Sequence, residues 1–264
     1  MVKELIEWQR SNIMSLRNST FSTAAVKDVT ALAYYFRKPK EFDSTFWRTE
    51  FAFLKTFQTQ GMLPAVLVVN EASPVIERFC EKYSVDLQTS AGLVPGESRS
   101  LCIDLVEKLH LRFKTQYVLT IQDDGFPLRP GLEKFVGKWD WIGAPWVRHC
   151  TYYDFYPYKY CVGNGGFSLR SKRLCECASA YYRKYFSRLP YWWYLLGDDL
   201  FYCRTLRYLF PSVRERYFWA SAEEASSFSI ECNLDFLGNG IFPLGFHGKA
   251  GWENGCERGL FREY

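Results

Sequence analysis

The sequence predicts an α/β fold in which helices cover both faces of a mostly parallel central sheet. Short runs of apolar, often β-branched residues alternate with longer segments of helical periodicity between residues 29 and 125. The runs are apolar without alternation, as in Ala-Val-Leu-Val-Val at residues 65–69, which is typical of strands buried on both faces. Polar residues follow three of these runs, and ligands of such sheets bind beyond the carboxyl ends of the strands.

Each element has its own signal in the chain. Residues 2–18 form an expected amphipathic helix, whose apolar set is Leu5, Ile6, Trp8, Ile13 and Leu16. The expected strands lie at 29–36, 65–70, 85–89 and 117–121. The helices between them lie at 41–60, 73–83 and 98–113. Asp43 and Ser44 are candidate caps of the first of these, and Ser73-Pro74 opens the second.

The second half of the chain has weaker periodicity and more aromatic residues and glycines. Two further helices are expected there, at 174–188 and 199–210. No linker, repeat or low-complexity tract divides the chain. We therefore expect one Rossmann-like domain (residues 1–264) with an irregular C-terminal half, divided into an N-terminal helical extension (1–27), a first half (28–126) and a second half (127–264).

Composition narrows the class of function. The 264 residues carry a net charge of +4, which is too small to indicate nucleic-acid binding. Aromatic residues make up 19%, and such rings suit sugars and nucleobases as well as a large core. Nine scattered cysteines without a Cys-x-x-Cys pair argue against structural zinc and fit a reducing compartment. The charged N-terminus resembles no secretory signal and no apolar run is long enough to span a membrane, so we expect a cytoplasmic protein.

Two carboxylates follow the strand at 117–121. Asp123 and Asp124 would repel each other at a buried strand tip unless a cation lies there, and hard oxygen ligands favour Mg²⁺ or Mn²⁺. Gly125 would allow a close backbone approach to a ligand. The alternative is an ordinary turn built from Asp and Gly.

Four further features are candidate site residues. Asn164, Gly165 and Gly166 belong to a glycine-rich segment whose amides could bind sugar hydroxyls, or which could form a hairpin turn. Asp198 and Asp199 stand at the start of an expected helix, where they could be caps or a general base. His247 lies between glycine residues in a chain with three histidines, and a lone histidine is otherwise usually structural. Arg99 at a helix N-terminus could attract phosphate or be solvated.

Several motifs in order resemble a known family. They are Gln-x-Asp at 122–124, Trp-Asp-Trp-Ile-Gly-Ala-Pro-Trp at 139–146, and Gly-Asn-Gly-Gly-Phe-Ser-Leu-Arg at 163–170. Over residues 28–248 the chain resembles the GT-A-fold glycosyltransferases, and more particularly a family of bacterial and viral glycosyltransferases with this motif series. It departs from a strict Asp-x-Asp motif, which leaves open whether Asp123 touches metal or ribose.

The resemblance implies roles for the candidate residues. It implies a GT-A-like domain whose first half binds the nucleotide and whose second half binds the acceptor. Asp124 and His247 would hold Mn²⁺ or Mg²⁺, and Asp199, aided by Asp198, would be the catalytic base of an inverting enzyme. Donor contacts would come from residues at the strand ends and the glycine segment: Phe36, Arg37, Asn70, Arg99, Gln122, Asp123, Asn164, Gly165 and Gly166.

The expected activity is transfer of a sugar from a nucleotide-diphosphate sugar to a glycan or lipid-linked acceptor. A UDP-sugar is the first donor to consider. The aromatic residues between Trp146 and Tyr160 would form a flap or an acceptor platform, and those at 191–194 an acceptor wall. Two alternatives remain: a nucleotidyltransferase acting on sugar phosphates, and a non-catalytic carbohydrate-binding protein. The glycine-free segment Tyr-Phe-Arg-Lys-Pro-Lys at 35–40 counts against the first, and two acidic pairs count against the second.

Overall fold

The computed structural model describes residues 3–24, 26–38, 42–146, 162–189, 197–232, 234, 237–238 and 240–259. It contains a central sheet of six strands in the order β3-β2-β1-β4-β7-β6. Four neighbouring strands are parallel: β1 (Val29–Tyr35), β2 (Ala65–Val69), β3 (Val85–Thr89) and β4 (Tyr117–Thr120). The α/β class, with a mostly parallel sheet flanked by helices in a single domain, is therefore confirmed.

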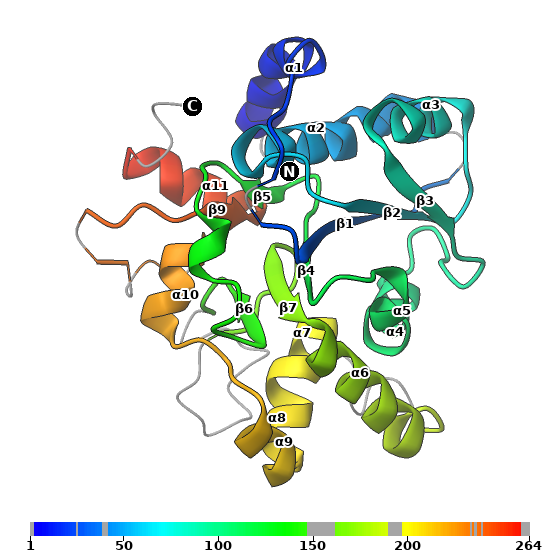
Figure 1. The fold of residues 1–264 in the computed structure, drawn as a ribbon, viewed down its shortest axis with the longest axis vertical. Coiled ribbons are helices and arrows are strands. Elements are labelled where there is room, and N and C mark those ends of the chain that lie inside the picture. The colour runs from blue at the N-terminus through cyan, green and yellow to red at the C-terminus, as the bar shows by residue number, and fades with distance from the viewer. Residues whose placement is uncertain are drawn as a thin grey trace.

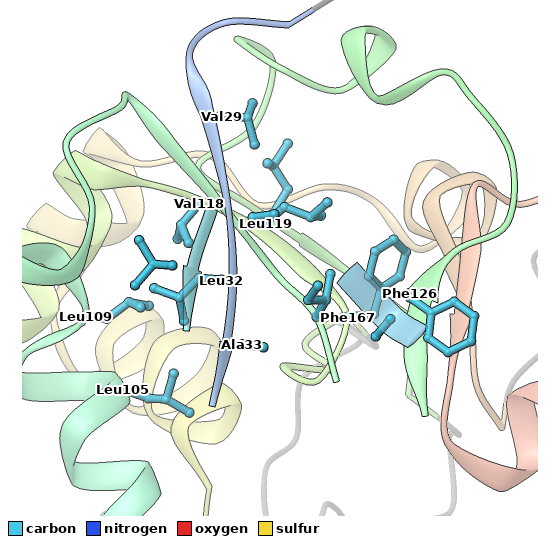
Figure 2. Close-up of a cluster of buried hydrophobic side chains, with 14 of the residues drawn as sticks. Val29, Leu32, Ala33, Leu105, Leu109, Val118, Leu119, Phe126 and Phe167 are labelled. Atoms are coloured by element: carbon cyan, nitrogen blue, oxygen red, sulfur yellow. The ribbon is translucent and has the colours of Figure 1, made fainter. Parts of the chain in front are cut away.

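Helices cover both faces of this sheet (Figure 1). On one face lie α1 (Lys3–Arg17), α2 (Phe42–Gln60) and α3 (Pro74–Tyr83). On the other lie α4 (Ser98–Glu107), α5 (Leu109–Arg112) and α6 (Lys172–Tyr181). Figure 2 shows Leu32 of β1 and Val118 of β4 gathered with Leu105 and Leu109 of the second group of helices. All five residues of β2 are buried, which explains its unbroken apolar sequence.

Several boundaries differ from the predicted ones. The helix expected at 98–113 is divided at Lys108, whose dihedral angles (φ −119°, ψ −11°) depart from those of a regular α-helix. Asp43 and Ser44 lie inside α2 rather than before it. Ser73 is the N-cap of α3, and its hydroxyl accepts a hydrogen bond from the Ile76 N–H. The helix expected at 174–188 is α6 followed by the π-helical turn η3 (Tyr182–Phe186).

The second half of the chain is more regular than expected. Strand β7 (Ser168–Ser171) is antiparallel to β4 and to β6 (Trp141–Gly143), so these two strands extend the central sheet. A small second sheet has the order β5-β9-β8, formed by β5 (Gly125–Pro127), β9 (Gly245–His247) and β8 (Ser229–Ile230). These strands have two to four residues, too few for a periodic signal.

The helices of the second half complete the fold. One helical run comprises α7 (Asp198–Leu200), the π-helical η5 (Phe201–Leu206) and α8 (Arg207–Leu209), close to the predicted 199–210. It is followed by α9 (Pro211–Arg216) and α10 (Ala222–Phe228), and the described chain ends near α11 (Gly248–Glu257). A 3₁₀ turn, η2 (Leu132–Lys134), precedes β6. In the described part of the chain, no helix is both long and apolar enough to cross a membrane.

Candidate active site

The site is built on the turn that follows β4. The backbones of Gln122 and Gly125 exchange two hydrogen bonds, of 2.7 and 3.1 Å, so that Asp123 and Asp124 occupy the tip of a tight turn. Gly125 then starts β5, and its pairing partner in β9 is His247. The N–H of Gly248 donates to the Asp124 carbonyl oxygen at 2.8 Å. This pairing brings the C-terminal histidine to the acidic turn.

The imidazole of His247 lies at the centre of a polar cluster. Its Nε2 atom is 3.0 Å from Gln122 Oε1 and 3.8 Å from Asp124 Oδ1. Its Nδ1 atom is 3.1 Å from Glu231 Oε1 and 2.9 Å from Asn164 Nδ2. Burial lowers the pKa of His247, but the hydrogen bond to Glu231 and the carboxylates of Asp124, Glu231 and Asp199 outweigh burial and raise it. The cluster joins four segments that are far apart in the sequence.

Glycine residues make room for this cluster. A Cβ atom on Gly166 would overlap the His247 ring, and one on Gly165 would lie 3.0 Å from Asp198 Oδ2. Asn164 is 5% exposed, and its Oδ1 atom accepts a hydrogen bond from the Gly166 N–H at 3.1 Å. Asn164 therefore orients His247 and the glycine loop. Its side chain is engaged within the protein rather than directed to an open cavity.

The two carboxylates of the turn have different partners. Asp123 Oδ2 is 2.9 Å from Arg48 Nη1 and 3.8 Å from Arg37 Nη2. The Asp123 carbonyl oxygen accepts a hydrogen bond from Gln9 Nε2 at 2.8 Å. Burial raises the pKa of Asp123, and Arg48 counteracts this. Asp123 thus faces arginines, whereas Asp124 faces His247.

The second acidic pair begins α7, as the sequence predicts. Asp198 Oδ2 is 2.8 Å from Nη2 of Arg170, a residue of β7 that is fully buried. The Leu200 N–H donates to Asp199 Oδ1 at 2.8 Å. Burial and the neighbouring Asp198 raise the pKa of Asp199 to about 7. At neutral pH this carboxyl group is therefore divided between its acidic and basic forms.

Arg170 also holds the glycine loop. Its Nη2 donates to the Gly165 carbonyl oxygen at 2.9 Å and its Nε to Ser168 Oγ at 3.0 Å. The guanidinium carbon lies 4.3 Å from the centre of the Trp141 ring and 5.3 Å from that of Tyr202. Sequence reasoning missed this residue because nothing in the sequence distinguishes a buried arginine from a solvated one.

Glu231, which sequence reasoning offers only as a substitute for Asp199 as the base, is a second residue whose contact with His247 it did not predict. It follows β8 directly, binds His247, and its charge contributes to the raised pKa of Asp199. The sequence gives it no signal of its own, because the strand before it has only two residues, Ser229 and Ile230. Glu231 thus contacts His247 and also acts electrostatically on Asp199 of the second acidic pair.

A cavity of about 200 Å³ adjoins this cluster at the carboxyl ends of β1 and β4. Five of the predicted donor residues line it: Phe36, Arg37, Gln122, Asp123 and Gly165. Asn70 exchanges hydrogen bonds with the backbone of Arg37, at 3.2 and 3.3 Å, and so fixes the end of β1. Arg99 lies in the first turn of α4 as expected, but it lines a separate pocket with Gly92, Ile103 and Lys108.

Most of the predicted aromatic platform lies outside the described residues, because residues 147–161 and 190–196 are not among them. Trp146 is described: it is buried and packs against Gly163, where a Cβ atom would overlap its ring. The flap, the acceptor platform and the acceptor wall remain predictions.

The residues at Asp124 fit a divalent ion in part. Metal ligands of this kind lie about 2.0–2.2 Å from the ion. Two ligand atoms 3.8 Å apart, as are Asp124 Oδ1 and His247 Nε2, can therefore share one ion. Carboxylates suit manganese and magnesium, whereas imidazole is a ligand of transition metals in general. Within the described ranges no three His, Cys, Asp or Glu residues are arranged around a common metal position, so substrate oxygens or water would have to complete the shell.

Comparison with known proteins gives a family and distant similarities to solved structures. A family model described as "Protein of unknown function (DUF5672)" matches residues 103–247. A comparison with curated proteins found no match.

Among solved structures, the chain is similar to the apo-form glycosyltransferase GlyE of Streptococcus pneumoniae TIGR4, with 12% identity, a TM-score of 0.47, and coverage of 84% of this chain and 54% of that one. It is also similar to the mannosyltransferase Ktr4p of S. cerevisiae in complex with GDP (8% identity, TM-score 0.43, coverage 68% and 71%). A third is the mannosyltransferase PcManGT of Pyrobaculum calidifontis, with 8% identity, a TM-score of 0.34, and coverage of 66% of this chain and 53% of that one. The chain spans about half the length of GlyE and of PcManGT, and similarities at this distance do not establish a shared activity.

Proposed function

The chain belongs to the DUF5672 family, whose model matches more than half of its length, and from its site we propose that it is a divalent-metal-dependent glycosyltransferase. It would transfer a sugar from a nucleotide-diphosphate sugar to an acceptor hydroxyl, in a domain of the GT-A type. Residues 28–126 would bind the nucleotide and residues 127–264 the acceptor. One observation carries the proposal: Asp124, His247, Glu231 and the Asp198-Asp199 pair converge beside a cavity at the carboxyl ends of the strands.

The cavity side of the site is suited to the donor. Phe36 offers an aromatic ring for a base, and Arg37 a cation for phosphate. Gln122 and Gly165 line the same space, while Asn70, Asn164 and Gly166 hold these groups in place. Asp123 would reach ribose from its pair with Arg48. Among nucleotide-diphosphate sugars, we propose a UDP-sugar as the first donor to test. Arg99 lies in its separate pocket and would contribute only if the donor extended there.

Asp124 and His247 would hold the metal ion. Bound there, Mn²⁺ or Mg²⁺ would neutralise the diphosphate as it leaves. Glu231 contacts Nδ1 of His247 and would orient the ring so that Nε2 faces the ion. Gln122 Oε1, now 3.0 Å from Nε2, would then have to turn away or join the ligands of the ion. Asp123 is engaged by Arg48, which favours Asp124 as the carboxylate ligand.

Asp199 would act as the base on the acceptor side. As the acceptor oxygen forms its bond to the anomeric carbon, the bond from that carbon to the diphosphate oxygen breaks, and the hydroxyl proton passes to an Asp199 oxygen. If the enzyme inverts, the leaving and arriving oxygens need separate groups, because one carboxylate cannot serve both faces of the sugar. Asp198, held by Arg170, would position Asp199.

A panel of nucleotide sugars tests the proposal. The protein is incubated with each donor and a glycan or lipid-linked acceptor, with manganese, with magnesium and with chelator, and products are identified by mass spectrometry. Transfer that requires metal supports the proposal. Release of pyrophosphate from a sugar phosphate and nucleotide would instead identify a nucleotidyltransferase, and sugar binding without turnover a carbohydrate-binding protein.

Matched variants sharpen the result. Asp124→Asn and Asp199→Asn should abolish most transfer, whereas Asp86→Asn, at an exposed position of β3, should not. Equal activity in all three variants would contradict the proposed site.

A further inference from the structure

One end of the molecule exposes apolar side chains on neighbouring helices. Tyr185 of η3 is 45% exposed, Leu189 just after it 41%, and Leu209 at the end of α8 59%. In Figure 1 the helices α6, α8 and α9 lie together at the end of the molecule remote from α1. Large apolar groups exposed side by side are unusual in a monomeric protein and indicate an interaction site.

These side chains belong to one continuous surface. The ring of Phe210 lies 4.5 Å from that of Tyr181 and 5.3 Å from that of Tyr185, measured between ring centres. The hydroxyl groups of Tyr181 and Ser212 are 3.5 Å apart. Leu189 donates its N–H to the Phe186 carbonyl oxygen, and the Phe186 ring also packs on Phe210. We call the surface formed by residues 181–189 and 207–216 the basic aromatic face.

Positive charge surrounds the exposed apolar groups on this face. Lys184 and Arg188 on one segment, and Arg214 and Arg216 on the other, are all exposed. Arg183 is exposed as well, and it pairs with Glu107 at 3.2 Å. Glu215 is the one carboxylate in the sequence of the two segments. Positive charge is therefore concentrated on this face, although the whole chain has a net charge of only +4.

We propose that the basic aromatic face binds the surface of an anionic lipid membrane. Lysine and arginine are attracted to anionic headgroups, and their stems cover neighbouring apolar surface. Tyrosine prefers the interface, and leucine inserts below the headgroups. A symmetric dimer through this face would oppose like charges, and nucleic acid would leave Leu189 and Leu209 without a role.

The face is connected directly to the candidate site. Asp199 and Leu209 belong to one helical run, so at about 1.5 Å per residue the candidate base lies within roughly 15 Å of the face. A membrane bound there would hold the site close to acceptors carried by lipids. This last consequence rests on the proposed function, whereas membrane binding itself does not.

Vesicle sedimentation with the full chain tests the proposal. Vesicles of phosphatidylcholine with phosphatidylglycerol should bind the protein, with binding that falls as salt rises, and vesicles of phosphatidylcholine alone should bind at least tenfold less. The variant Lys184→Glu/Arg188→Glu/Arg214→Glu should lose binding at least tenfold. Leu209→Ser should reduce binding severalfold without a change of charge.

A charge-matched control separates the face from overall charge. Lys27→Glu/Lys134→Glu/Lys138→Glu reverses three exposed lysines outside the face and should keep binding within about twofold of the parent. Equal loss in both triple variants would overturn the proposal, as would equal binding to neutral vesicles. Preference for a single-stranded oligonucleotide over anionic vesicles in competition would also overturn it. Because no sugar transfer is measured, failure here leaves the proposed function untouched.

Discussion

The Arg170 guanidinium and the Asp198 carboxylate form an ion pair, with Nη2 and Oδ2 2.8 Å apart, beneath the glycine loop. The same Nη2 atom donates to the Gly165 carbonyl oxygen. One buried side chain therefore fixes the position of the second acidic pair relative to the loop that carries Asn164. Removal of Arg170 or of Asp198 should affect both the acidic pair and the glycine loop, because an uncompensated charge would remain in a buried place.

Arg170→Met should lower stability by about 3–5 kcal/mol, since Asp198 loses its buried partner. Urea unfolding followed by circular dichroism measures this. The double variant Arg170→Met/Asp198→Asn should recover much of the loss, because the unpaired charge is then removed. A double variant as unstable as the single one would show that the Gly165 and ring contacts of Arg170, rather than the ion pair, dominate.

Asp199→Asn should reduce transfer by roughly 100-fold or more while donor affinity stays nearly unchanged, because the base is lost and the cavity is not. Steady-state kinetics and donor titration measure the two effects separately. Near-parental turnover would refute the assignment. Asp198, Glu223, Glu224 or Glu231 would then be the base, or the enzyme would retain configuration.

The same variant should be more stable than the parent at alkaline pH. The native pKa of Asp199 is about 7, above its ordinary value of 3.8, so the unfolded chain releases this proton at lower pH than the native protein. The stabilisation that its proton gives is present below about pH 4 and is lost as the pH rises to 7. At pH 8 Asp199→Asn should thus gain on the order of a few kcal/mol in free energy of unfolding. A thermal melt with no gain at pH 8 relative to pH 4 would contradict the raised pKa.

The pH dependence of transfer should have its acidic limb near pH 7, where Asp199 takes up a proton. Asp198→Asn removes the negative charge that, after burial, raises this pKa most. The acidic limb of kcat/KM should therefore move to lower pH in that variant. A limb that stays in place would assign the titration to another group.

Gly166→Ala should displace the His247 ring, because the new Cβ atom would overlap it. We expect the free energy of unfolding to fall by about 1–3 kcal/mol. Metal-dependent activity should fall even under conditions in which the variant remains folded. Gly92→Ala is the matched control, since its Cβ atom would meet only Lys108 Nζ at 3.5 Å. Equal effects of the two substitutions on activity would argue against a precise placement of His247.

The sequence predicted the first half of the fold well, because β1 to β4 are buried on both faces and their apolar runs are unbroken. It did not reveal β7, β6 or the β5-β9-β8 sheet, whose strands are paired with partners that are remote in sequence. Among candidate residues, Asp124 and His247 do come together and Asp198 does begin a helix. Arg170 and Glu231 could not be assigned roles, since burial and contact with His247 are properties of the folded chain. Arg99 was expected near the same sheet edge, but α4 directs it to a separate pocket.

The pairing of β5 with β9 has a consequence for synthesis of the protein. The ribosome delivers Asp124 long before His247, and the two residues meet only when Gly245–His247 has emerged and joined β5. A nascent chain can therefore complete β1 to β4 and still lack the histidine of the candidate metal site. Translation itself postpones assembly of that site until the second sheet closes.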